Sequence, residues 1–166
     1  FTVGIDGQTV TFTDFNSASL SGDDGDDDVT VTVIAGFTTA VTVNGDSPTG
    51  HTGDTLHVEG TAAGETIAID LGLGTIDVGS ADPITFTTLE ALSVDAAGGV
   101  DTITVTGAAA YDYTPGSGSD EGTLVAGSFP ISFSNLAGGE TLDLSGTSLV
   151  AHGTDSDNTF ALSSTG

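Results

Sequence analysis

Apolar and polar residues alternate along many short stretches of this chain. In the stretch from Thr102 to Thr106, for example, Ile103 and Val105 alternate with three threonines. Successive side chains of a strand point to opposite faces, so a period of two predicts strands with one buried face. We count about fifteen such stretches of about 4–7 residues, separated by turns rich in Gly and Asp. No stretch has the 3.6-residue period of an amphipathic helix, and the pattern therefore predicts an all-β protein.

The order of strands and turns recurs along the chain. Residues 83–107 (PITFTTLEALSVDAAGGVDTITVTG) contain three strands and a Gly/Asp turn. Residues 9–33 follow the same order, and residues 130–146 follow it in shortened form. Serial copies of one unit are typical of repeat proteins. We therefore predict a single repetitive β domain over residues 1–166. Its related units span about 1–46, 54–107 and 122–166.

Residues 108–121 interrupt this pattern. The segment is rich in Ala, Gly and Ser, and it holds the only two tyrosines of the chain, Tyr111 and Tyr113. This composition predicts an insertion loop at the surface. The tyrosines have two interpretations: they are exposed groups for adhesion or carbohydrate stacking, or one of them folds back to cover an edge of the core.

Two all-β folds suit many short strands with evenly spaced turns. A parallel β-solenoid (β-helix) is favoured, because the repeats are long and serial and the turns are rich in Gly and Asp. Small residues at inward positions, such as Ala68 and Ala161, also suit tight stacking of successive coils. The alternative is one Greek-key β-sandwich or a pair of them.

The charge of the chain restricts its partners. The 166 residues include 24 Asp and Glu but no Lys or Arg, which gives a formal charge of −24. Binding to nucleic acid requires basic residues, and anionic membrane surfaces repel such a chain, so neither partner is expected. No apolar run is long enough to insert into a membrane. The charge suits cation binding, surroundings of high salt, or a basic partner. The first residue is Phe1, so we expect a processed or excised piece of a longer protein.

The repeat also resembles a known group of sequences. The motif begins with Phe86, Glu90 and Leu92 and continues into a Gly-Gly-x-Asp-Thr-Ile turn and strand. The remaining motif residues are Val94, Gly98, Gly99, Asp101, Thr102, Ile103, Val105 and Gly107. This pattern resembles the β-strand repeats of very large secreted bacterial surface proteins, which often lie beside repeats-in-toxin calcium-binding motifs. The resemblance covers most of the chain and implies export, an extracellular or cell-surface location, and a surface or matrix role. It implies no reaction.

One acidic window is the candidate metal site. Residues 22–30 resemble the repeats-in-toxin nonapeptide, from which they depart only at Asp23, and residues 99–104 match half of it. The resemblance implies Ca²⁺ between stacked copies, held by Asp carboxylates and backbone carbonyls. Crowded carboxylates are also the oxygen ligands that a hard cation prefers. The alternative is a solvated acidic turn. The candidate ligands are Asp23, Asp24, Asp26, Asp27, Asp28 and Asp101.

Other chemistry has little support in the sequence. His51 and His57 flank Asp54, but no third histidine lies near them, and His57 alternates with apolar residues that would face the core. We therefore predict surface histidines. The chain has no Cys and no nucleophile elbow, and the spacing of carboxylates carries no information in so acidic a chain. We expect no catalytic residue and no enzymatic activity.

These observations lead to two functional hypotheses. The first is an extracellular structural protein, a subunit or repeat of a self-assembling fibre, sheath or surface layer that joins head to tail through its end strands. The strand phase at Phe1 matches that at Phe160, which is expected if copies continue end to end. The alternative is a calcium-stiffened adhesin or binding module of a giant surface protein. Its partners would be surface or matrix components.

Overall fold

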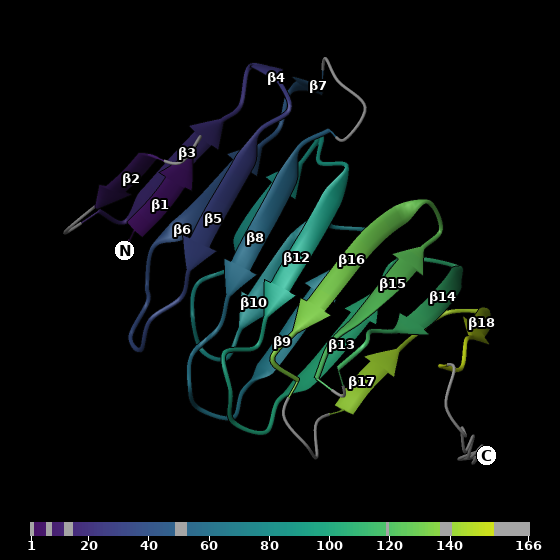
Figure 1. The fold of residues 1–166 in the computed structure, drawn as a ribbon. Helices are drawn as coiled ribbons and strands as arrows, with labels where there is room; N and C mark the ends of the chain where they lie inside the picture. Colours follow the sequence, from purple (N-terminus) through teal and green to yellow (C-terminus); the bar gives the residue numbers. More distant parts are fainter. Residues whose placement is uncertain are drawn as a thin grey trace.

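The computed structural model describes residues 2–5, 8–11, 15–48, 53–118, 120–136 and 141–154. Strands account for 55% of the residues and helices for none, so the predicted all-β class is confirmed. The strands form two mixed sheets and one short two-strand pairing, and neither large sheet closes into a barrel (Figure 1). Among the described residues, none forms a helix with the length and apolar character needed to cross a membrane.

The first sheet contains nine strands. In spatial order they are β18 (Ser148–Ala151), β14 (Ala110–Pro115), β15 (Gly122–Ala126), β16 (Phe129–Ser134), β12 (Ala91–Asp95), β8 (Thr55–Glu59), β5 (Asp28–Thr32), β1 (Thr2–Ile5) and β2 (Gln8–Thr11). The second sheet contains seven strands. Their order is β17 (Thr141–Leu144), β13 (Thr102–Thr106), β9 (Thr66–Asp70), β10 (Thr75–Val78), β11 (Ile84–Thr87), β6 (Ala40–Asn44) and β3 (Ser17–Ser21). The short pair consists of β4 (Asp24–Gly25) and β7 (Ser47–Pro48).

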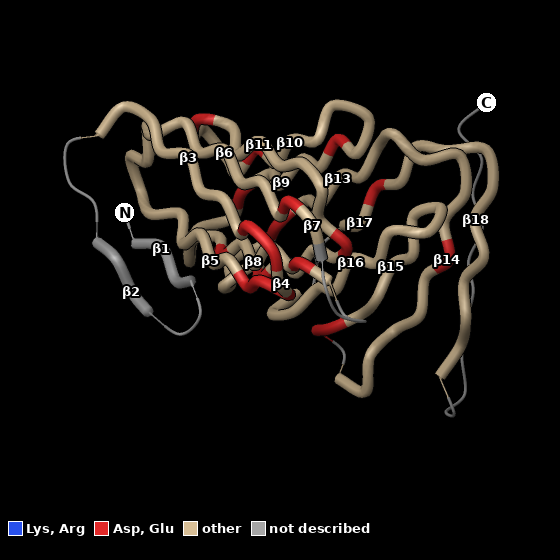
Figure 2. The backbone as a smooth tube through the Cα atoms, turned by 90° about the horizontal axis from the view of Figure 1, so that it is seen from above, with Lys and Arg blue, Asp and Glu red and all other residues tan. Residues whose placement is uncertain are grey.

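The chain alternates between the two sheets, which lie face to face as two layers (Figure 2). Many neighbouring strands within a layer pair in parallel, whereas β1 pairs antiparallel with both β2 and β5. In the first sheet, one apolar residue from each of four neighbouring strands lies in register. These residues are Val29 of β5, Leu56 of β8, Leu92 of β12 and Ile131 of β16. This register places the apolar residues of neighbouring strands in one buried row.

Each layer also contains one antiparallel meander. Strands β9, β10 and β11 form it in the second sheet, and β14, β15 and β16 form it in the first. Each meander adds two strands to its own layer. Consequently the first sheet from β5 to β18 and the second sheet from β3 to β17 both contain seven strands.

The core lies between the layers and consists of the apolar residues of each strand that point toward the other layer. In β13, Ile103 and Val105 are fully buried while the threonines between them are half-buried. Because Val, Ile and Thr favour strands, local propensity and burial agree throughout the central strands.

The expectation of a loop over residues 108–121 was wrong for much of that segment. Residues Ala110–Pro115 form β14, which pairs with β15 and β18. The physical reason is Tyr111, which is 3% exposed. Its hydroxyl lies 3.1 Å from the carbonyl oxygen of Val105 and 3.3 Å from that of Ser145, and it donates to one of them. The interpretation in which one tyrosine covers a core edge therefore holds for Tyr111.

Candidate functional sites: acidic corners and open strand edges

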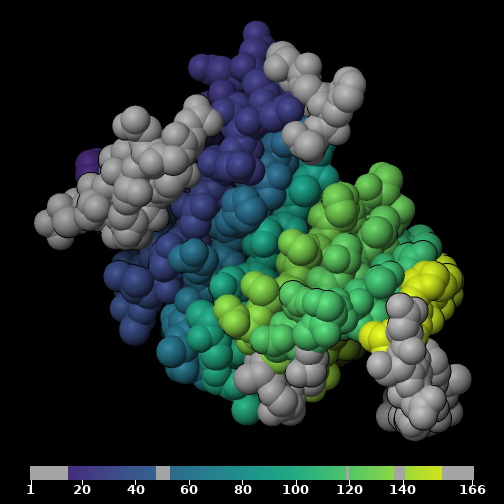
Figure 3. Space-filling view, in the orientation of Figure 1, coloured from purple at the N-terminus to yellow at the C-terminus, as the bar shows by residue number. Residues whose placement is uncertain are grey.

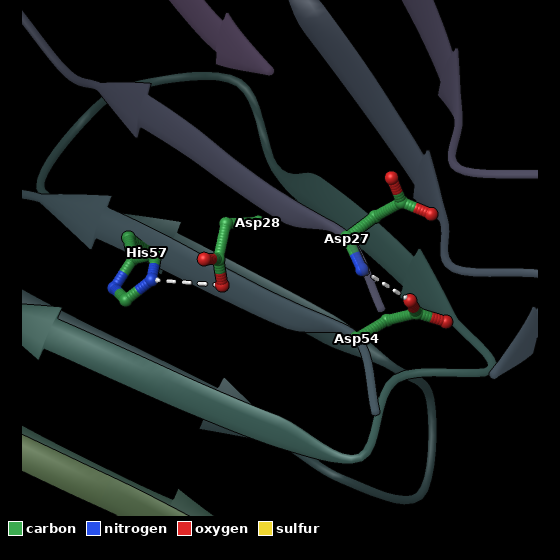
Figure 4. A network of polar contacts seen from close by, with 4 residues as sticks. All are labelled: Asp27, Asp28, Asp54 and His57. Carbon is green, nitrogen blue, oxygen red and sulfur yellow. Dashed lines mark hydrogen bonds and ion pairs between the residues drawn. The ribbon is translucent and has the colours of Figure 1, made fainter. Parts of the chain in front are cut away.

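Acidic residues stand directly before several strands, at the corners where the chain passes between the layers. In the corners that lead into the first sheet, Asp27, Asp54 and Glu90 precede β5, β8 and β12. The backbone N–H of Asp27 donates to Asp54 Oδ1 (2.8 Å, Figure 4), and the N–H of Asp54 donates to Glu90 Oε2 (2.8 Å). The carboxylates of Asp54 and Glu90 thus each accept the N–H of the acid that precedes the neighbouring strand. We call these three residues the acid ladder.

The opposite corners, which lead into the second sheet, repeat the arrangement. Glu65 precedes β9 and Asp101 precedes β13, and the N–H of Glu65 donates to Asp101 Oδ1 (2.8 Å). Sequence reasoning did not assign this role to Asp54, Glu65 or Glu90. The available signal is an acid placed immediately before a period-two stretch, as in DTLHV, ETIAI and DTITV.

Two of these carboxylates are buried with one oxygen atom unpaired. Asp54 and Asp101 are each 1% exposed, and neither Oδ2 atom has a hydrogen-bond partner within the described part of the chain. A buried carboxylate without a compensating partner is costly. Since the chain has no Lys or Arg, neither side chain is available to form an ion pair with these carboxylates.

Glycines make room for the ladder carboxylates. A Cβ atom added at Gly45 would lie 2.5 Å from the carbonyl oxygen of Thr88 and 2.6 Å from Asp54 Oδ2. At Gly22 it would lie 2.7 Å from Asp27 Oδ2 and 2.8 Å from the carbonyl oxygen of Gly45. A carboxylate oxygen and a carbonyl oxygen therefore approach each of these two glycines, Gly22 and Gly45, which we call the glycine column.

The predicted cluster of aspartates divides in the structure. Asp23, Asp24 and Asp26 are exposed around β4, where acidic residues gather in Figure 2. Asp28 is also exposed, whereas Asp27 is half-buried and lies against the ladder.

Asp101 does not join the other predicted ligands. It lies in the corner between β12 and β13, at the opposite ends of the strands (Figure 1). Within the described ranges, no three or more His, Cys, Asp or Glu residues are grouped so that they could hold a metal ion. A cation bound at these corners would therefore need backbone carbonyls or water molecules among its ligands.

The histidines pair with carboxylates on the outer surface. His57 alternates with buried Leu56 and Val58 in β8, and its Nε2 atom lies 3.5 Å from Asp28 Oδ1 (Figure 4). His152 Nε2 lies 2.7 Å from Asp112 Oδ1. The expected outward orientation of His57 is thus observed. His51 lies outside the described residues.

The corner beside the ladder is held by side-chain hydrogen bonds. Asp46 accepts a hydrogen bond from the Ser21 hydroxyl, and its own N–H donates to the Thr88 hydroxyl (2.9 Å). The bond from Ser21 is the main cause that lowers the pKa of Asp46 below its ordinary value. These bonds connect the turns after β3, β6 and β11.

The ends of the two layers are open strand edges. Among the described residues, β17 pairs only with β13 and β18 only with β14, and β3 pairs only with β6. Strand β18 lies at the rim of the molecule (yellow in Figure 3) and exposes Leu149 and Val150. Leu142 and Leu144 of β17 are half-buried against the core.

Comparison with known proteins found no family model, no curated protein and no solved structure that matches this chain.

Proposed function

We propose that this chain is an extracellular or cell-surface structural unit whose two layers continue, end to end, into another copy or repeat. The layers would then form one β-solenoid, in which the parallel rows of each sheet run on from unit to unit. The parallel pairing of the edge strands β3, β17 and β18 supports this fold, because a parallel strand added beside any of them would extend the existing register. The remaining edge strand, β2, pairs antiparallel with β1 and gives no such support.

The observation that carries the proposal is the low charge of the edges. Residues 15–22, which include β3, contain no charged residue, and residues 141–154, which include β17 and β18, contain a single acid, Asp143. Proteins that must stay monomeric commonly protect edge strands with charges, prolines or bulges. In a chain with 24 acids, edges nearly free of charge and carrying apolar residues favour pairing with another strand.

An edge substitution tests this proposal. Leu149→Asp places a charge on β18, where Leu149 is 57% exposed. Val100→Asp is the control, because Val100 is 62% exposed and lies in the β12–β13 corner, not in an edge strand. Sedimentation velocity in salt that screens the net charge should show concentration-dependent association of the wild type and of Val100→Asp, and monomers of Leu149→Asp. Equal association of all three proteins would refute assembly through this edge.

The second candidate is a calcium-stiffened adhesin or binding module. The unpaired Oδ2 of Asp54 favours it, since Ca²⁺ accepts carboxylate and carbonyl oxygens together and both kinds approach the glycine column. The ligands would be Asp27, Asp54 and the carbonyls of Gly45 and Thr88. The exposed aspartates around β4 would have a smaller role.

Thermal unfolding with and without chelator tests this second candidate. At a Ca²⁺ concentration 100 times the dissociation constant, the unfolding equilibrium constant should fall about 100-fold. Asp54→Asn should lose this response, and Asp77→Asn, which removes a half-buried acid from the outer face of β10, should keep it. The calcium candidate fails if the wild type gains nothing from Ca²⁺ beyond the effect of equal ionic strength.

A further inference from the structure

An uncharged cleft lies where the two meanders meet. It is lined by the β9–β10 turn (residues 71–74), the end of β11 and the residues after it (86–89), Gly107 and Ala108 after β13, and Ala126 and Phe129 around the β15–β16 turn. Its volume is about 440 Å³. Small-molecule sites commonly occupy about 300–1,000 Å³.

The cleft exists because of the hairpins. Along the same edge, the corners that lead from the second sheet into β5, β8 and β12 are acidic. Beside the meanders, two hairpin turns stand in that place, and neither contributes an acid to the lining. None of the twelve lining residues is charged, although acids make up 24 of the 166 residues of the chain.

The walls are somewhat more apolar than polar and carry an aromatic pair. The rings of Phe86 and Phe129 are stacked, with centroids 6.2 Å apart and planes 13° from parallel. Leu71, Leu89 and Ala108 are half-buried beside them, so their apolar surface is partly in contact with water. Leu73 stands at the rim and is 74% exposed.

Close backbone contacts hold one side of the cleft in place. Gly107 has a φ of +91°, and a Cβ added there would lie 2.3 Å from the backbone nitrogen of Gly72. Gly74 has a φ of +66°, and an added Cβ would lie 2.5 Å from the carbonyl oxygen of Phe86. Because only glycine fits both positions, the turn packs directly on neighbouring backbone and leaves the cleft without intruding side chains.

We propose that this cleft binds an uncharged, largely apolar small molecule that contains a ring. The half-buried ring of Phe129 offers an aromatic surface that a ligand ring can contact, with the buried ring of Phe86 stacked behind it. The negative potential of the chain disfavours anions, and the cleft offers no carboxylate to a cation. The cleft is separate from the edge strands, so the inference does not depend on end-to-end assembly.

The test uses indole as a neutral ring probe and indole-3-acetate as its anionic counterpart. Binding is measured by chemical-shift titration of the full chain. We expect saturable binding of indole at one site, with shifts in the residues around Phe86 and Phe129. The anion should bind at least about ten-fold more weakly, and this difference should shrink as salt rises.

Two variants identify the site. Leu73→Asp changes an exposed side chain, so it should fold normally, and it should weaken indole binding about ten-fold or more. Val100→Asp adds the same charge to an exposed apolar position that does not line the cleft and should leave binding unchanged. Equal effects of the two variants, or no saturable binding of indole by the wild type, would overturn the proposal. It would also be overturned if Leu73→Asp abolished self-association seen in the wild type, because the cleft would then be a contact between copies.

Discussion

Replacing Tyr111 by Phe tests the explanation of why residues 110–115 form a strand and not a loop. The hydroxyl of Tyr111 is buried, donates to the carbonyl of Val105 or of Ser145, and accepts a long hydrogen bond from the N–H of Ala108 (3.4 Å). It therefore connects the segment between β13 and β14 to the turn after β17. Tyr111→Phe keeps the buried ring and removes only these bonds.

The cost follows from the number of bonds lost. One donated bond and one weak accepted bond, at about 1 kcal/mol each, give a loss of about 1–2 kcal/mol in the free energy of unfolding. For a chain of this size, each kcal/mol lowers the melting temperature by about 2–4 °C. Tyr113→Phe is the control, because Tyr113 is only partly buried and the structure shows no hydrogen bond for its hydroxyl to any described residue.

Urea unfolding followed by circular dichroism measures both variants. We expect Tyr111→Phe to lose about 1–2 kcal/mol with an unchanged slope against urea, and Tyr113→Phe to change by less than about 0.5 kcal/mol. Equal losses in the two variants would show that the Tyr111 hydroxyl does not hold β14 in place.

Two further predictions concern the core and the corner. Ile103→Ala should lower the free energy of unfolding by about 2–5 kcal/mol, because Ile103 is fully buried. Leu142→Ala, at the opposing position of the edge strand β17, should lower it by less, because Leu142 is only half-buried. Similar losses of stability in the two monomeric variants would contradict the open edge. Asp46 has a lowered pKa in the folded state, so its carboxylate stabilises the fold above its unfolded pKa, and this contribution is lost as the pH falls through the folded pKa. Asp46→Asn should therefore be less stable than wild type near neutral pH and approach it in acid, measured by unfolding from pH 7 to 3, and a difference that is constant with pH would contradict this cause.

The strands could be predicted from the sequence, but their partners could not. The alternation in Thr102–Thr106 and in Thr55–Glu59 gives both the strand and its buried face, because period two determines which residues face the core. It does not say that β11 pairs with β6, whose residues lie 43 positions earlier in the chain. That pairing depends on the meander β9–β10–β11, which places β11 beside β6.

The candidate sites could likewise be predicted only in part from the sequence. The acidic window was visible in the sequence, and Asp27 does lie against the glycine column. Asp54 was not selected, because its role arises only when pairing places it between Asp27 and Glu90. The predicted match of phase between Phe1 and Phe160 lies outside the described residues and stays a prediction.

Negative-stain electron microscopy of the purified chain, with and without a calcium chelator, tests the proposed structural role most directly. We predict ordered filaments that survive chelation and that disappear in Leu149→Asp, because the contacts between units are strands and apolar side chains. Monomers under all conditions would contradict end-to-end assembly, and filaments that dissolve on chelation would assign the contact to calcium instead of to the strand edges.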